Sequence, residues 1–205
     1  ASLSGVGVDY FAGFAPLQKG QGIVEFHNAG FVARMHGGEV GGLRLDHAEV
    51  GIADMHEAVV EVDATASGDL ARALPFVQRS PVGAVLGGQF MGLTGQGPAD
   101  YAVKLHLPTL PDEPHDLVIR TNLRSATVGI PALRAPAERV TGTFEVHNLE
   151  MRAHTLRGSM LDGPFELDVE PGPLTRDVDA SVLMHGRGHS VGAGLPAFIG
   201  LPPGI

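Results

Sequence analysis

The sequence contains no cysteine and no tryptophan, and aromatic residues make up only 5% of it. Without cysteine the chain can form no disulfide, no thiolate metal site and no cysteine nucleophile. Basic residues are also scarce, because 14 lysines and arginines stand against 23 acidic residues and leave a formal net charge of -9. This balance disfavours nucleic acid and anionic membrane surfaces as partners, since both are bound through dense lysine and arginine.

Long apolar runs are missing as well. No run of apolar residues reaches the length needed for a transmembrane helix, and the first seven residues lack the pattern of a signal peptide. Glycine and proline are abundant, at 29 and 15 of 205 residues, beside a hydrophobic content of 43%. This combination is typical of many short strands joined by turns.

Alternation of apolar and polar residues dominates the sequence and predicts strands with one aliphatic face. The clearest case is the segment 99–107, whose apolar side chains are Tyr101, Val103, Leu105 and Leu107. The same pattern recurs in three further pairs, which are Val24 and Phe26, Phe144 and Val146, and Phe165 and Leu167. Turn residues follow at intervals of about 8–12 residues, which favours an antiparallel meander. The sequence therefore predicts an all-β, mainly antiparallel fold.

One segment has a helical pattern instead. Leu70, Leu74 and Val77 lie on one stripe of a helix over residues 67–77, and Ser67 stands where a capping residue is expected. Pro75 is expected to kink or shorten this helix. A second helical turn is expected to start at Ser80, so the sheet should carry a helical insert near residues 68–88.

A short internal match suggests a repeat. The residues from Gly22 to Asn28 match those from Gly142 to Asn148 at an interval of 120 residues, and the match continues beyond them with one inserted residue. We therefore expect repeats of about 120 residues, each with a short helical insert, with a first β-groove repeat over 1–120 and a second, truncated repeat over 121–205.

Motifs for catalysis or metal binding are weak. The segment 188–192 matches the G-x-S-x-G nucleophile elbow, but no Asp, Glu or His follows Ser190 to complete a triad. The 10 histidines form no H-E-x-x-H motif and are expected to be scattered over the surface. We expect no enzymatic activity, no cofactor and no metal.

The aliphatic face of such a sheet must be covered. The sheet can fold on itself as a sandwich or barrel, another chain can cover it, or a ligand can. The shortage of aromatic residues disfavours a sugar, whereas an aliphatic lining suits acyl chains, which gain about 0.8 kcal/mol for each buried methylene. The alternation by itself leaves a lipid trough and a closed β-sandwich both open.

Several short motifs resemble, in order, the periplasmic region of the AsmA-like envelope proteins of the YhdP family. They are the residues 14–17, 22–26, 38–42, 66–70, 80–87, 140–144 and 161–169. Each motif is a turn or an apolar alternation, and their order along the chain carries the resemblance. The element Ser-Pro-Val-Gly-Ala, which starts at Ser80 after the short helix, is the most distinctive of them.

The resemblance implies a curved, groove-like β-sheet in a protein that is anchored in the inner membrane and spans the periplasm. It implies phospholipid as the partner, carried towards the outer membrane without catalysis, and it implies that this chain is a middle fragment of the longer protein, which other envelope proteins could bind. The groove would be lined by Val24, Phe26, Tyr101, Val103, Leu105, Leu107, Phe144, Val146, Phe165 and Leu167. The alternative is a structural or protein-binding β-sandwich with a closed core, and a hydrolase comes third.

Overall fold

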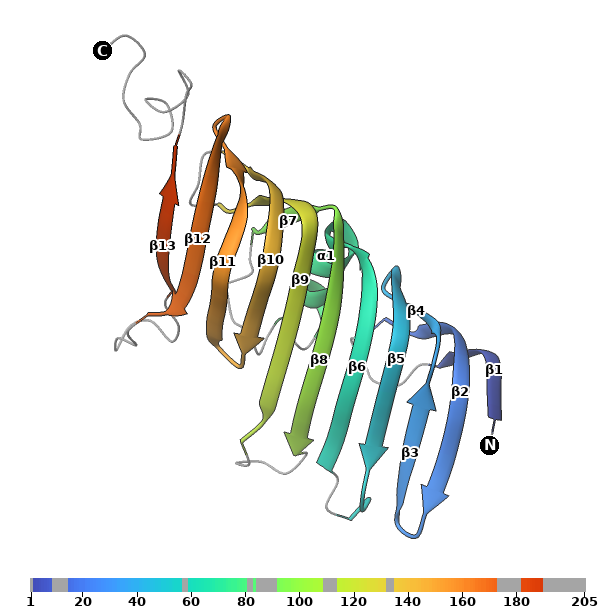
Figure 1. The fold of residues 1–205 in the computed structure, drawn as a ribbon. Coiled ribbons are helices and arrows are strands. Elements are labelled where there is room, and N and C mark those ends of the chain that lie inside the picture. Colours follow the sequence, from blue (N-terminus) through green and yellow to red (C-terminus); the bar gives the residue numbers. More distant parts are fainter. Residues whose placement is uncertain are drawn as a thin grey trace, which may run out of the picture.

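The computed structural model of the chain describes residues 2–8, 15–56, 59–80, 83, 92–108, 114–131, 135–172 and 182–189. These residues form one antiparallel sheet of 13 strands with the helix α1 (Leu70–Arg79) on one of its faces (Figure 1). The first strands are β1 (Ser2–Val8), β2 (Leu17–His27), β3 (Gly30–Met35), β4 (Gly38–Val40), β5 (Leu43–Ile52) and β6 (Val59–Asp69). After α1 come β7 (Thr94–Gln96), β8 (Pro98–Pro108), β9 (Asp116–Gly129), β10 (Ala137–His147), β11 (Glu150–Met160), β12 (Gly163–Pro171) and β13 (Val182–Gly188).

The strands lie side by side in nearly the order of the sequence, as expected for a meander. The path runs β1-β2-β3-β5-β6-β8-β9-β10-β11-β12-β13, while β4 pairs with β2 and β5, and β7 pairs with β9. Ten spacings of about 4.8 Å make this path about 48 Å wide. The prediction of an all-β, mainly antiparallel, groove-like sheet is confirmed.

Apolar side chains form rows across the strands because every strand pair keeps the pattern of alternation in register. One row consists of Met35, Ala48, Ala64, Val103, Ile119, Val146 and Met151. The next row consists of Val24, Ala33, Val50, Val62, Leu105 and Leu117. Both rows lie on the same face, since their members are two positions apart in each strand. This face is aliphatic over most of the width of the sheet.

The opposite face carries ion pairs between neighbouring strands. They join Arg34 to Glu25 and Glu49, Lys104 to Asp63, Arg120 to Glu145, Arg124 to Asp100, and Arg157 and Arg187 to Glu166. These side chains are largely exposed, so each pair adds little to stability. Their regular placement shows that this is the solvated face.

Bulges bend several strands. Ser125, Arg139 and Thr155 have φ values of 65°, 52° and 53°, and each lies where the pairing of β9, β10 or β11 shifts in register. Bulges of this kind increase the local twist and curve a strand. They give the sheet curvature that a regular ladder would not have.

The helix begins later than the sequence suggests. Ser67 lies in β6 opposite Asp100 of β8, so the prediction of Ser67 as the capping residue is wrong. The ladder between β6 and β8 continues to Asp69, and pairing between strands overrides the local capping signal. Asp69 caps α1 instead, because its carboxylate accepts hydrogen bonds from the backbone of Ala71 at 2.8 Å and of Gly97 at 3.1 Å.

Pro75 lies inside α1 and does not end it, since the helix continues to Arg79. Ser80 closes the helix by donating its backbone N–H to the carbonyl oxygens of Phe76 and Val77, each at 3.1 Å. The second helical turn expected from Ser80 falls mostly on residues 81–82 and 84–91, which lie outside the described residues.

Backbone features recur at an interval of 120 residues. Strands β2 and β10 begin at Leu17 and Ala137, and β5 and β12 begin at Leu43 and Gly163. The hairpin residues Asn28 and Asn148 share a φ of 51°. The interval stays at 120 up to the start of β12, so no residue is inserted between the copies there. The predicted boundary at residue 120 falls inside β9, and the division into two repeats stays a prediction.

Candidate functional site

The ten residues predicted to line a groove all lie on the aliphatic face, but their exposure differs. Eight of them are half-buried, and they are Val24, Tyr101, Val103, Leu105, Leu107, Phe144, Phe165 and Leu167. Val146 is buried, with 3% of its surface exposed, whereas Phe26 is 72% exposed. The face is therefore neither sealed like a core nor fully open to water.

Helix α1 covers one end of this face. Its Leu70 and Ala73 are buried in one cluster with Ala99, Leu123 and Ala126 of the sheet. Tyr101, Val103, Leu105 and Phe144 pack against the same cluster but stay half-buried. In the part of the chain that the structure describes, no second sheet lies over the aliphatic face. Beyond the helix, the curved sheet presents its half-buried aliphatic side chains with no described element above them, and we call this surface the trough.

The two lips of this trough differ in chemistry. At the first lip, where β5 and β8 begin, α1 contacts the turn between β4 and β5. A side chain at Gly41 would lie 2.7 Å from the ring of Phe76, and one at Gly42 would lie 3.4 Å from Arg72. We call this edge the helix lip. Both residues have the positive φ that favours glycine, and at Gly41 a Cβ would also collide with the ring of Phe76.

The opposite lip is formed by the other ends of the strands. Phe26 and Phe31 lie there with their ring centroids 6.2 Å apart. The backbone N–H of Met55 donates to the carbonyl oxygen of Ala29 at 2.9 Å, which fastens the loop after β5 to the hairpin between β2 and β3. Met55 is 54% exposed. We call this edge the aromatic lip, and it offers apolar surface to whatever lies in the trough.

Tyr101 supplies a polar group to the floor of the trough. Its hydroxyl is buried and has no hydrogen-bond partner among the described residues. Burial, followed by the negative charges of Asp69 and Asp100, raises the pKa of Tyr101 to about 12. The phenol therefore stays neutral and can donate a hydrogen bond at every physiological pH.

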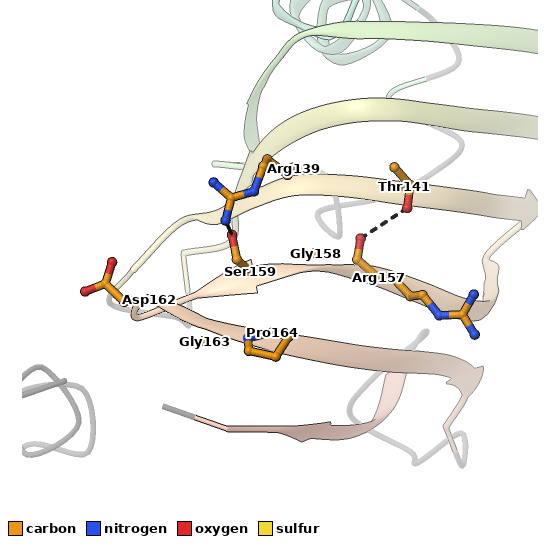
Figure 2. Close-up of a pocket in the computed structure, with 8 residues that line it drawn as sticks. All are labelled: Arg139, Thr141, Arg157, Gly158, Ser159, Asp162, Gly163 and Pro164. Atoms are coloured by element: carbon orange, nitrogen blue, oxygen red, sulfur yellow. Dashed lines mark hydrogen bonds between the residues drawn. The ribbon is translucent and has the colours of Figure 1, made fainter. Parts of the chain in front are cut away.

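A polar hollow of about 410 Å³ lies on the other face of the sheet. Figure 2 shows Arg139 reaching toward Ser159, and their hydrogen bond measures 2.7 Å. Thr141 Oγ1 donates to the carbonyl oxygen of Arg157 at 3.5 Å. The bulge at Arg139 creates this hollow, and none of the ten predicted groove residues lines it. It is separate from the trough.

Within the described residues no group of three or more histidine and acidic side chains is placed to hold a metal ion. His147 Nε2 lies 2.6 Å from Asp116 Oδ1, and His106 pairs with Glu61, but all four side chains are exposed on the solvated face. Ser190 of the elbow motif lies outside the described residues, so the motif stays untested.

Sequence reasoning missed the residues that shape the lips. Phe31 and Met55 carry no periodic signal of their own, and Arg72 reads only as a polar position on a helix. Their roles depend on contacts between segments that are far apart in the sequence. The ten predicted residues share one face because alternation alone assigns a side chain to a face, and that they line a groove stays a prediction.

Comparisons with known proteins point to one family. The family model described as YhdP protein matches residues 1–202. Neither a curated protein nor a solved structure matches the chain. Among the described residues no helix has the length and apolar character needed to cross a membrane. With a match over nearly its whole length and a curved antiparallel sheet, the chain belongs to the YhdP family of AsmA-like envelope proteins.

Proposed function

We propose that this chain is a periplasmic segment of a phospholipid-transfer protein that carries acyl chains in the trough between inner and outer membrane. The observation that supports it best is the aliphatic face itself. Its rows run across most strands of the sheet, and eight of the ten predicted lining residues are half-buried rather than sealed. The parent protein would be anchored in the inner membrane, and the chain would perform no catalysis and need no cofactor.

The trough suits acyl chains in size and chemistry. From Tyr101 to Leu107 the strand β8 extends about 20 Å at 3.4 Å per residue. An acyl chain occupies half of a hydrocarbon core that is about 30 Å thick, or about 15 Å. Each methylene placed on the floor contributes about 0.8 kcal/mol. Because these contacts are not directional, a lipid can slide from row to row without breaking specific bonds.

The closed β-sandwich is the competing function class. It requires a second layer that buries residues such as Val103 and Leu105, as β-sandwiches do with their inner faces. Within the described ranges only α1 lies over this face, and only over one end of it. This arrangement favours a bound ligand, rather than a second sheet, as the layer that covers the aliphatic face.

Lipid extraction tests the proposal directly. Protein purified from a bacterial periplasm without detergent should carry phospholipid, detected by mass spectrometry at about one molecule or more per chain. A stable, monomeric protein that carries no lipid would refute the proposal and favour the sandwich.

Substitutions then separate a lining residue from a core residue. Val103→Asp and Phe144→Asp should abolish lipid loading and leave the β-sheet circular dichroism unchanged, because a charge in the trough repels acyl chains while half-exposed positions keep access to water. Ala102→Asp is the matched control, since residue 102 lies on the solvated face opposite Arg120. If Val103→Asp unfolds the protein while Ala102→Asp does not, Val103 belongs to an ordinary core.

A further inference from the structure

The cations of this protein are divided between two environments. Nine of the twelve described arginines and lysines lie within 4 Å of a carboxylate, and they are Lys19, Arg34, Arg44, Lys104, Arg120, Arg124, Arg152, Arg157 and Arg187. Within the described part of the chain, Arg72, Arg79 and Arg139 have no such partner. Arg139 bonds Ser159 on the solvated face. Arg72 and Arg79 both lie on α1.

The two helix arginines are aligned. They are seven residues apart, which is two turns of an α-helix and about 10 Å along its axis. Leu70, Ala73 and Val77 occupy the opposite side of α1 and pack into the hydrophobic cluster. Arg72 and Arg79 are therefore exposed on the side of the helix that faces away from the sheet.

The position of Arg72 at the helix lip brings charge to the edge of the trough, and Arg79 lies two turns farther along α1. The stem of Arg72 lies over the turn between β4 and β5, near Gly42. The nearest carboxylate along the helix, Asp69, is occupied by the backbone N–H groups of Ala71 and Gly97. With respect to the described residues, both guanidinium groups are available to an anion, in a chain whose formal net charge is -9.

At the aromatic lip, the described ranges contain no arginine or lysine that lacks a carboxylate partner. Asp54 and Asp116 lie there with histidines as their partners, at 2.8 and 2.6 Å. Arg152 near this lip is held by Glu150 at 2.8 Å. The remaining side chains at this edge include exposed apolar ones such as Phe26 and Met55. A ligand with an anionic end and an apolar end is therefore oriented by the two lips.

We propose that Arg72 and Arg79 bind the phosphate of a phospholipid whose acyl chains lie in the trough and point toward the aromatic lip. This inference rests on the proposed function and adds an orientation and a headgroup contact to it. Arginine suits the role because its guanidinium forms charge-assisted hydrogen bonds with phosphate oxygens in a bidentate geometry. A tail of about 15 Å fits along the strands between the two lips.

The test compares a phospholipid with a lipid that has the same acyl chains but no phosphate-containing headgroup. Delipidated protein is incubated with vesicles that contain phosphatidylglycerol or diacylglycerol with the same acyl chains, and lipid bound to the separated protein is measured by mass spectrometry. We expect the double variant Arg72→Gln/Arg79→Gln to load about five- to tenfold less phosphatidylglycerol than the unaltered protein, as two exposed ionic contacts are lost. Loading of diacylglycerol should not change.

A charge-matched control excludes a general effect of net charge. Lys104→Gln/Arg120→Gln removes the same two charges from the solvated face, where both are paired, and should leave phosphatidylglycerol loading unchanged. Equal loading of phosphatidylglycerol by the arginine variant and the unaltered protein would overturn the inference while the proposed function stands. Reduced loading of both lipids would overturn it too, since α1 would then act only through its packing. If the unaltered protein loads neither lipid, the proposed function fails and the inference with it.

Discussion

Tyr101 is the residue whose environment departs most from what its chemistry demands. A buried hydroxyl normally has a partner, and leaving one without a partner costs about 1–3 kcal/mol. The hydroxyl of Tyr101 has none among the described residues. The floor of the trough thus encloses a donor that has no partner among the described residues.

Tyr101→Phe should therefore be tolerated. Removal of an unsatisfied hydroxyl at constant ring packing is expected to raise the free energy of unfolding by about 1 kcal/mol. Urea unfolding of delipidated protein, followed by circular dichroism, measures the change. A loss of stability would mean that the hydroxyl has a partner in solution.

Alkaline titration of Tyr101 gives a second prediction. Its folded pKa is raised from 10.0 to about 12 because burial disfavours the phenolate. The contribution of this group to stability is then fully present below pH 10 and is lost as the pH rises toward 12. In a Tyr10→Phe background, which leaves Tyr101 as the only tyrosine, phenolate absorbance should rise with a midpoint near 12. A midpoint near 10 would show that the ring is solvated.

At the scale of the element, one carboxylate links β13 to β11 across β12. Glu166 of β12 receives Arg157 of β11 at 3.0 Å and Arg187 of β13 on its other side. Hydrogen bonds from Arg157, and next from Arg187, lower the pKa of Glu166 below its ordinary 4.5. Because the folded pKa is lowered, the stabilisation is present above pH 4.5 and is lost as the pH falls through the folded value.

Glu166→Gln should weaken the attachment of β13 at neutral pH. Protonation of Glu166 at acid pH is expected to have the same effect in the unaltered protein, because both changes remove the carboxylate charge. Amide hydrogen exchange of residues 182–188 is expected to accelerate severalfold, while exchange in β8 and β9 stays the same. Glu145→Gln is a suitable control, since it removes one exposed ion pair, with Arg120, from the middle of the sheet. Unchanged exchange in β13 would show that backbone pairing alone holds the strand.

Helix α1 is the second informative element. Pro75 removes a backbone donor inside a ten-residue helix, which in a regular helix costs about 3 kcal/mol. Packing of Leu70 and Ala73 against the sheet and the cap by Asp69 offset this cost. Pro75→Ala should raise the melting temperature by several degrees and leave the positions of Arg72 and Arg79 unchanged. An unchanged melting temperature would indicate that the helix is held by packing alone.

At the scale of the whole molecule, the exposed aliphatic face should govern behaviour in solution. A contiguous apolar surface of this kind favours association or ligand binding. Delipidated protein is expected to bind a hydrophobic dye and to self-associate, as measured by fluorescence and by light scattering. Added phospholipid should reverse both effects and raise the unfolding free energy by about 2.7 kcal/mol at a hundredfold excess over its Kd. A delipidated protein that stays monomeric and binds no dye would contradict an open trough.

Much of the fold could be predicted because alternation is local. The alternation in residues 99–107 predicts which side chains share a face of β8 without any knowledge of the neighbouring strands. The pairing of β8 with β6 and β9 agrees with this prediction. The start of α1 could not be predicted in the same way. Ser67 carries a local capping signal, but pairing of β6 with β8 extends the strand to Asp69, and that pairing involves residues about 30 positions away.

The sequence by itself determined the strands, their aliphatic face and the family, because periodicity and short motifs depend only on neighbouring residues. Only the tertiary structure decided which aliphatic residues are sealed. Val103 and Val146 lie in one row across the sheet, yet the first is half-buried and the second is 3% exposed. Exposure depends on what packs over each position, and the placement of α1 over one end of the sheet is set by contacts between distant segments.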